Sequence, residues 1–237
     1  MRRLTGVLLA AMLVAGVVPA GAKTVTEHCA ESHRSAEDPI VFPGRPGASH
    51  LHVFFGNRTT NAFSTSASLV SQESTCKDEP LDASGYWVPA VYVDGQEVDL
   101  KVAPYWKNDN QAVATIPTGF AYVASGWGTN VGFACTSGGG ISDQPLSCKG
   151  GQRLKFRVNF PSCLAGTIAL YPSGRACPAG TVKIPRLLLQ VSLPVSSGLE
   201  HTITLSSGDH TTMHADFLMA FDPEAFQTGI VDRLNGR

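Results

Sequence analysis

The sequence is poor in charge and in common catalytic signatures. Only 16% of the 237 residues are charged, and 18 basic residues nearly balance 19 acidic ones. Because electrostatic binding of nucleic acid needs a clear basic excess, this balance argues against a nucleic-acid partner. The chain also has no GxSxG nucleophile elbow, phosphate-binding loop, dinucleotide-binding glycine pattern or HExxH sequence. These absences disfavour the enzyme classes that depend on those motifs.

Long apolar runs are absent after the N-terminus. The apolar run at residues 7–18 follows Arg2 and Arg3 and precedes Ala20-Gly21-Ala22, a small-residue cleavage pattern. About a dozen apolar residues are too few to cross a bilayer, which needs about 20. The sequence therefore predicts a signal peptide over residues 1–22 and no membrane anchor after its cleavage. The remaining chain, residues 23–237, is predicted to be a single secreted domain, extracellular or periplasmic.

The sequence does contain many turn-forming residues between short apolar runs. It has 24 glycines and 15 prolines, and its apolar share of 43% is typical of a packed globule. The apolar runs are rich in Val, Phe, Tyr and Thr, which favours strands. Strands are predicted over 51–55, 86–93, 112–116, 120–124, 154–160, 187–193 and 201–205. We expect a mainly β fold: an antiparallel β-sandwich or jelly-roll-like domain.

Two local signals refine this fold. Asp94-Gly95 is a typical two-residue hairpin turn. The C-terminus is the one segment with a helical pattern, with Asp222 as N-cap, Pro223 in the first turn and Gly236 at the end. Its predicted buried face consists of Phe226, Ile230, Val231 and Leu234.

All six cysteines lie in the predicted exported part of the chain. Export permits disulfides, and no CxxC pair indicates a zinc or redox centre. Many pairings are possible. We expect Cys135–Cys148 to close the loop that contains Gly138-Gly139-Gly140, Cys163–Cys177 to close a Pro/Gly-rich turn, and Cys29–Cys76 to fix the N-terminal segment.

The sequence His50-Leu51-His52-Val53-Phe54-Phe55 carries the first candidate site. Alternate residues of a strand share a face, so Leu51, Val53 and Phe55 suit the core. His50 and His52 then project together from the other face, about 7 Å apart along the strand. Two such imidazoles could bind a metal or provide a general base. The alternative is a polar, solvent-facing surface with two ordinary histidines.

A second segment repeats this alternation. Its apolar positions are Met213, Ala215, Phe217 and Met219. His214 and Asp216 share the opposite face. If the two strands lie together, three imidazoles and a carboxylate converge, a set that suits Zn²⁺ or another borderline divalent metal. The set equally suits a metal-free site in which Asp216 orients a histidine that transfers a proton.

Other candidates are less specific. Asp82 is a reserve catalytic acid that precedes two aromatic residues, Tyr86 and Trp87. These two side chains could stack on a sugar ring, although filling the core is the more frequent role of an aromatic residue. Asn57 is a candidate substrate-binding residue and begins a glycosylation sequon with Arg58 and Thr59.

Several ordered blocks of the sequence resemble one known family. They are Asp38 to Gly44, Ser49 to Asn57, Ser74 to Cys76, Asp82 to Pro89, Phe160 to Cys163, Leu205 to Gly208 and His214 to Phe217. The chain resembles the secreted family called domain of unknown function nineteen-ninety-six, or DUF1996. Members are exported by bacteria and fungi, and some fungal members are joined to carbohydrate-binding or cell-wall modules. The resemblance implies a polysaccharide or cell-wall glycan as substrate or ligand.

The chain departs from the family pattern at one point. Typical members continue after Phe-Pro-x-Cys with Trp-Asp-Gly and then Asp-His-x-Ser-His. Here Cys163 is followed by Leu164-Ala165-Gly166, and residues 167–174 contain no histidine.

The leading hypothesis is an exported carbohydrate-active protein that cleaves polysaccharide with a His/Asp centre, by hydrolysis or by elimination. Its candidate residues are His50, His52, His214 and Asp216, with Asp82 in reserve. The alternative is a non-catalytic secreted module that binds glycan or metal, which the divergent segment favours. A third interpretation gives the histidines only a structural role.

Overall fold

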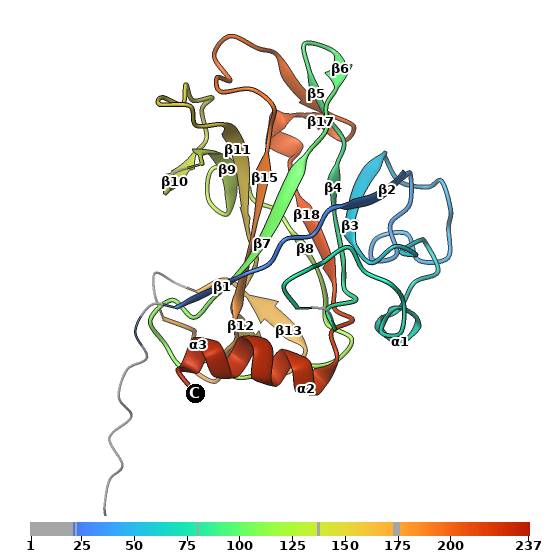
Figure 1. Cartoon of the computed structure of the whole chain (residues 1–237), viewed down its shortest axis with the longest axis vertical. Coiled ribbons are helices and arrows are strands. Elements are labelled where there is room, and N and C mark those ends of the chain that lie inside the picture. Colours follow the sequence, from blue (N-terminus) through green and yellow to red (C-terminus); the bar gives the residue numbers. More distant parts are fainter. Residues whose placement is uncertain (1–20, 22, 80, 137, 173–175) are drawn as a thin grey trace, which may run out of the picture.

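The computed structural model describes residues 21, 23–79, 81–136, 138–172 and 176–237. The predicted signal peptide, residues 1–22, lies outside the described residues except for Gly21. The regular secondary structure of the described chain is mostly antiparallel strands, with a helix at the C-terminus, as predicted (Figure 1).

The larger sheet has six antiparallel strands in the order β1-β7-β15-β11-β9-β10. Its strands are β1 (Thr24–Thr26), β7 (Lys101–Lys107), β15 (Arg186–Ser192), β11 (Leu154–Asn159), β9 (Val131–Cys135) and β10 (Gly138–Ser142). The second large sheet has five antiparallel strands in the order β2-β3-β4-β18-β8. Its strands are β2 (Glu31–Ser35), β3 (His52–Gly56), β4 (Gly85–Pro89), β18 (Ala215–Leu218) and β8 (Ala121–Ala124).

Two small sheets and several helical segments complete the fold. One sheet contains β17 (Gly208–Asp209), β16 (Ile203–Leu205), β5 (Val91–Val93) and β6 (Gln96–Glu97), and the other contains β13 (Ile168–Leu170), β12 (Cys163–Ala165) and β14 (Val182–Lys183). The helical segments are α1 (Ser66–Leu69), η1 (His210–Thr212), α2 (Pro223–Phe226), η2 (Gln227–Asp232) and α3 (Arg233–Asn235).

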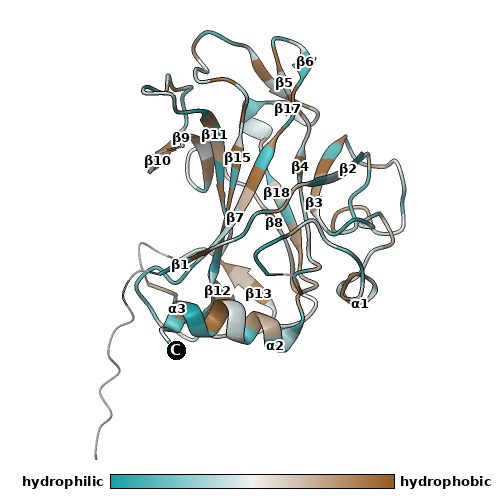
Figure 2. Cartoon of the chain, viewed as in Figure 1, coloured by the Kyte–Doolittle hydropathy of each residue, from teal (hydrophilic) through white to brown (hydrophobic). Residues whose placement is uncertain are grey.

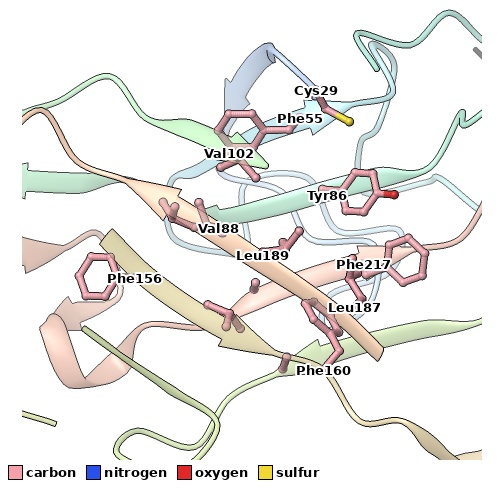
Figure 3. Packing of buried hydrophobic residues seen from close by; sticks show 14 of the residues in the cluster. Cys29, Phe55, Tyr86, Val88, Val102, Phe156, Phe160, Leu187, Leu189 and Phe217 are labelled. Carbon is pink, nitrogen blue, oxygen red and sulfur yellow. The ribbon is translucent and has the colours of Figure 1, made fainter. Parts of the chain in front are cut away.

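The main hydrophobic core lies between the two large sheets. Val102, Leu189 and Phe156 contribute from the six-stranded sheet, and Val88 and Phe217 from the five-stranded one (Figure 3). Burying a side chain of this size contributes about 1.5–3 kcal/mol. Two sheets joined by one shared core form a β-sandwich.

A second, smaller core covers the outer face of the five-stranded sheet. Phe54 and Trp87 are fully buried there, with ring centroids 5.4 Å apart. Leu69, Ala83, Leu218 and Ala220 complete this cluster. The face of β3 that carries His52 is therefore covered by protein, and the interpretation of that face as a solvent-facing surface is wrong.

The C-terminal helix confirms its predicted caps and face. The Asp222 side chain accepts hydrogen bonds from the backbone N–H groups of Glu224 and Ala225, at 3.0 and 2.9 Å. Gly236 ends the helix with a left-handed φ of 82°. The predicted face is buried in the main core, and hydrophobic and hydrophilic bands alternate along the helix in Figure 2. The buried residues are Phe226, Ile230, Val231 and Leu234.

All three predicted disulfides are present: Cys29–Cys76, Cys135–Cys148 and Cys163–Cys177. The predicted Asp94-Gly95 turn joins β5 to β6, with positive φ at both residues. In the described part of the chain, no helix has the length and apolar character needed to cross a membrane.

Three local predictions are wrong. The strand predicted over 86–93 is divided at Ala90 into β4 and β5, which belong to different sheets. Residues 112–116 form no strand, because Val113 bonds through its backbone N–H and C=O to the side chain of Asn235, each at 2.9 Å, instead of joining a sheet. The glycine-rich segment is not a loop either. It forms β10, which pairs with β9 across an irregular register.

Candidate metal centre

The register of the five-stranded sheet brings the two histidine segments together. β4 lies between β3 and β18, and it pairs His52 with Pro89 and Trp87 with Asp216. Continuing this register by two pairs beyond Asp216 and Trp87 places His214, just before β18, opposite Pro89. His52 and His214 therefore lie in one row across the sheet, separated by a compact proline ring. Two strand spacings, about 10 Å, separate their backbones, a gap that two imidazole rings can bridge.

The side chains of this row meet at short distances. Nε2 of His52 lies 3.5 Å from Nε2 of His214, and the latter lies 3.7 Å from Oδ2 of Asp216. The His50 ring centroid lies 4.2 Å from that of His52 and 5.1 Å from that of His214. One ring nitrogen from each of the three histidines lies within 4.8 Å of the others. The three imidazoles thus meet, and Asp216 lies beside His52 and His214.

Backbone carbonyl groups fix which nitrogens face the centre of the cluster. Nδ1 of His52 donates to the carbonyl of Glu37 at 3.0 Å, and Nδ1 of His214 donates to the carbonyl of Thr212 at 2.9 Å. Because a carbonyl oxygen only accepts, each neutral ring carries its proton on Nδ1 and a lone pair on Nε2. The two facing Nε2 atoms are then both acceptors and form no hydrogen bond with each other.

The remaining polar atoms of the cluster also lack partners. Nε2 of His50 and both carboxylate oxygens of Asp216 are buried and have no hydrogen-bond partner among the described residues. Leaving a buried polar group unsatisfied costs about 1–3 kcal/mol. A cation at the centre would interact favourably with all of these atoms.

Two of the spacings in the cluster fit a tetrahedral metal ion. Zinc–nitrogen bonds of about 2.0–2.1 Å at tetrahedral angles place two ligand nitrogens about 3.4 Å apart. The His52–His214 distance of 3.5 Å and the His214–Asp216 distance of 3.7 Å are close to this value. The donor set, three imidazoles and one carboxylate, is one that borderline divalent metals accept.

Burial controls the protonation of the cluster. It lowers the pKa of His52 to about 3, with a smaller contribution from His50, and it lowers the pKa of His50 to about 4, assisted by His214. It also lowers the pKa of His214. The imidazoles are therefore neutral at neutral pH, the form that binds metals. Burial and the neighbouring Asp38 raise the pKa of Asp216 well above its usual value, a shift that a bound cation opposes.

Three residues of the site were not predicted. The carbonyls of Glu37 and Thr212 orient the histidines, as described above. Asp38 is 2% exposed, and its Oδ1 accepts the N–H groups of Ile40 and Val41, both at 2.8 Å. A carboxylate oxygen of Asp38 lies within 4.8 Å of ligand atoms of His52 and Asp216. The Asp-Pro pair at 38–39 is a turn signal, but it carries no indication of which site the turn approaches.

Asp82 lies away from the histidines, on the opposite face of β4. Its Oδ2 accepts from the hydroxyl of Tyr86 at 2.7 Å, and Tyr86 packs in the main core. Asp82 and Glu27 are both fully buried, with carboxylate oxygens within 4.8 Å of each other. Burial, followed by the charge of Asp82, raises the pKa of Glu27 to about 11. The Cys29 and Cys76 sulfurs beside this pair are joined in a disulfide, so they are not thiolate ligands.

The predicted substrate contacts conflict with burial. Tyr86 and Trp87 are both 0% exposed and fill the two cores, so neither offers a face to a sugar ring. Asn57 is also fully buried, and its amide donates to the carbonyls of Leu69 and Ala83 at 3.2 and 2.8 Å. Asn57 therefore fastens α1 to the sheet, and its side chain is not free to contact a substrate or carry a glycan.

The segment that departs from the family pattern forms a separate part of the fold. Residues 163–165 and 168–170 are β12 and β13 of the three-stranded sheet, whereas the histidines belong to the five-stranded sheet. The loss of the Trp-Asp-Gly and Asp-His-x-Ser-His residues thus leaves the His50–His52–His214 cluster intact.

Fold and site together define a disulfide-bonded antiparallel β protein with a partly buried cluster of three histidines beside a buried aspartate. The chain belongs to the family described as Domain of unknown function (DUF1996), whose pattern matches residues 38–221. Comparison with curated proteins and with solved structures gives no match.

Proposed function

We propose that this protein is an exported, carbohydrate-active metalloprotein. In this proposal His50, His52 and His214 hold a divalent transition metal such as Zn²⁺, and Asp216 is the fourth ligand or lies beside it. The observation that carries the proposal is the pair of Nε2 lone pairs of His52 and His214, which face each other at 3.5 Å with no proton available between them. Export is supported by the three disulfides, which form in oxidising compartments.

Some residues around the cluster orient the histidine rings, and others leave the cluster accessible from solvent. The Glu37 and Thr212 carbonyls hold the rings in the ligand tautomer. His52 and Asp216 are fully buried, whereas the side chain of His214 is 15% exposed and His50 is half-buried. A substrate therefore approaches past His50 and His214. A bound metal of this kind acts as a Lewis acid toward a water molecule or a sugar oxygen.

A second candidate function is metal binding without catalysis. The burial of Tyr86 and Trp87 favours it, because it removes the aromatic surface that the sequence predicted for a sugar. The two functions share the metal centre and differ in whether soluble sugar is released from a polysaccharide.

Elemental analysis by mass spectrometry tests the metal centre. The mature protein, His50→Ala and His214→Ala are dialysed and compared with His201→Ala, which makes the same change at a histidine that pairs with Asp94 instead. We expect about one equivalent of a transition metal in the wild type and in His201→Ala, and a loss of at least tenfold in metal affinity in the other two. A metal-free wild type that takes up no Zn²⁺ or Cu²⁺ on titration contradicts the proposal.

Incubation with insoluble cell-wall polysaccharides tests the carbohydrate activity. We expect release of soluble sugar by the metal-loaded wild type and none by His214→Ala. Pull-down on the glycan without release of sugar supports the binding function. Unchanged cleavage by His50→Ala and His214→Ala contradicts a catalytic role for the cluster.

A further inference from the structure

A cleft with a cavity volume of about 500 Å³ lies beside the six-stranded sheet. Its lining includes Lys107 at the end of β7, Arg186 at the start of β15 and Lys183 of β14. The histidine cluster belongs to the other large sheet, so the cleft is a separate site. Its volume is within the range of about 300–1,000 Å³ that small-molecule sites occupy.

The cleft concentrates positive charge in a chain whose net charge is only −1. Four cationic side chains line it, those of Lys23, Lys107, Lys183 and Arg186, against the single acidic side chain of Asp109. The Asp109 carboxylate already pairs with Lys183 at 3.0 Å and with Arg186 at 2.6 Å. One carboxylate offsets one of four positive charges, so the lining carries a clear positive excess.

The sheet register sets two of these cations against each other. Lys107 and Arg186 are direct cross-strand partners between β7 and β15, an arrangement of like charges that destabilises a sheet. Burial, then Arg186 and Arg157, lowers the pKa of Lys107, and burial, then Arg186, lowers the pKa of Arg157. The fold gains nothing from this repulsion, whereas a bound anion would relieve it.

Two of the cationic groups, those of Lys183 and Arg186, are held in place by neighbouring polar side chains. Asp109 and Asn110 adopt left-handed φ values of 51° and 65°, a turn that costs about 1–3 kcal/mol per residue outside glycine. This turn directs the Asp109 carboxylate to Lys183 and Arg186. Arg186 also donates to the side chain of Asn159, and Lys183 donates to Ser162 Oγ at 2.8 Å. Groups fixed in this way lose little entropy when a ligand binds.

We infer that this cleft binds an anionic saccharide, a sugar that bears a carboxylate or a phosphate group. The cations meet the acidic group, and the amide and hydroxyl side chains of Asn110, Asn130 and Thr129 suit sugar hydroxyls. Single-stranded nucleic acid needs exposed aromatic faces for base stacking. The aromatic residues of this lining do not provide them: Phe160 is 2% exposed, and Tyr171 is half-buried with its hydroxyl bonded to the Asn159 carbonyl.

Calorimetric titration of the mature protein tests the cleft with an oligogalacturonate, a neutral oligosaccharide of equal length, glucose 6-phosphate and inorganic phosphate. We expect the anionic sugars to bind at least tenfold more tightly than the neutral one, with affinity that falls as salt rises from about 0.05 to 0.3 M. The two sugar anions separate carboxylate from phosphate recognition. Equal binding of the neutral sugar, or tighter binding of a DNA oligonucleotide, overturns the inference. Binding of inorganic phosphate as tight as that of both sugars overturns it as well.

Lys107→Gln is the decisive variant, with Lys77→Gln as its matched control at an exposed site elsewhere. We expect Lys107→Gln to weaken anionic-sugar binding about fivefold to tenfold, while its Tm stays equal to that of the wild type or rises because a like-charge pair is removed. Lys77→Gln should leave the affinity unchanged. Equal affinity losses in the two variants overturn the assignment to the cleft.

The inference that the anionic group belongs to a sugar rests on the proposed function. The experiments nevertheless distinguish failure of the metal centre from failure of the cleft. His50→Ala and His214→Ala should lose metal and keep anionic-sugar binding, whereas Lys107→Gln should lose sugar affinity and keep metal. A metal-free wild type that binds oligogalacturonate refutes only the metal centre. A metal-loaded wild type that binds no anionic sugar refutes only the cleft.

Discussion

At the scale of single residues, two buried polar clusters lie on opposite faces of β4. They differ in what can offset the energetic cost of burying their polar groups. Glu27 and Asp82 face the main core and are both carboxylates, so one of them stays protonated. His52, His214 and Asp216 lie on the outer face with unpaired acceptor atoms, an arrangement that a cation satisfies. The acid pair is therefore a structural cost, and the histidine cluster is the functional candidate.

Glu27→Gln should stabilise the protein at neutral and alkaline pH. The folded protein holds the Glu27 proton up to a pKa of about 11, whereas the unfolded chain releases it above about 4.5. Between these values the folded state binds more protons, so this group lowers stability as pH rises. Neutral glutamine removes that effect. We expect a gain of up to about 5 kcal/mol at pH 8 and none below about pH 4.5, measured by urea unfolding.

The control for this prediction is Glu200→Gln, the same change at an exposed position. It should shift the unfolding midpoint little at either pH. A Glu27→Gln variant that is equally destabilised at pH 4 and pH 8 would show that glutamine disturbs packing there and that the proton linkage is absent.

His52 should make the metal-free protein sensitive to acid. Its folded pKa of about 3 lies below the ordinary value of 6.5, so the unfolded chain binds the extra proton between these values. Stability then rises with pH across this window and is lost as pH falls below 6.5. In the presence of chelator, His52→Asn should reduce the slope by about 1.4 kcal/mol per pH unit near pH 5. His201→Asn, which makes the same change at a partly exposed site, is the matched control and should change the slope less.

At the scale of elements, the strands of the five-stranded sheet contribute side chains to both the main core and the second, smaller core. Val53 and Phe55 of β3 enter the main core, whereas Phe54 enters the second one. On β18, Phe217 and Leu218 divide in the same way. Strict alternation predicts the two faces of each strand, but it does not show that the second face is covered. His52 is fully buried under such a cover, and its Nδ1 donates to the carbonyl of Glu37 at 3.0 Å.

The cap of the C-terminal helix gives a prediction at this scale. Asp222→Ala removes the acceptor of two backbone N–H groups and should cost about 1 kcal/mol in the free energy of unfolding. Asp222→Asn keeps an acceptor oxygen and should cost less. Chemical denaturation of both variants checks the order. Equal losses would show that the charge near the helix N-terminus, and not the hydrogen bonds, stabilises this end.

At the scale of the whole molecule, the disulfides close loops of different lengths. Cys29–Cys76 spans 47 positions, whereas Cys135–Cys148 spans 13. In the chain-entropy treatment this difference in loop length is worth about 1 kcal/mol. Replacing Cys29 and Cys76 by alanine should therefore destabilise the protein more than replacing Cys135 and Cys148. Urea unfolding of the two double variants measures the difference, and the reverse order would contradict the prediction.

Local chemistry made several features of this protein predictable. The caps and buried face of the C-terminal helix, the Asp94-Gly95 turn and the core-facing positions of β3 and β18 depend on short-range patterns. Other strands escaped prediction for the same reason. β2 (Glu31–Ser35) is polar throughout, and β7 (Lys101–Lys107) contains a proline, Pro104, which is unfavourable in a strand. Both strands are therefore defined by their pairing with neighbouring strands.

Sequence patterns alone were enough for the β class, the helix and the faces on which His52, His214 and Asp216 lie, whereas the three cysteine pairs were one choice among many. Which of these faces meet depends on the folded arrangement of the strands. It placed β4 between the histidine strands, removed Trp87 and Asn57 from the surface, and set Lys107 opposite Arg186. The physical reason is that strand order and sheet packing join residues far apart in the chain, whereas turn, cap and alternation signals act over a few residues.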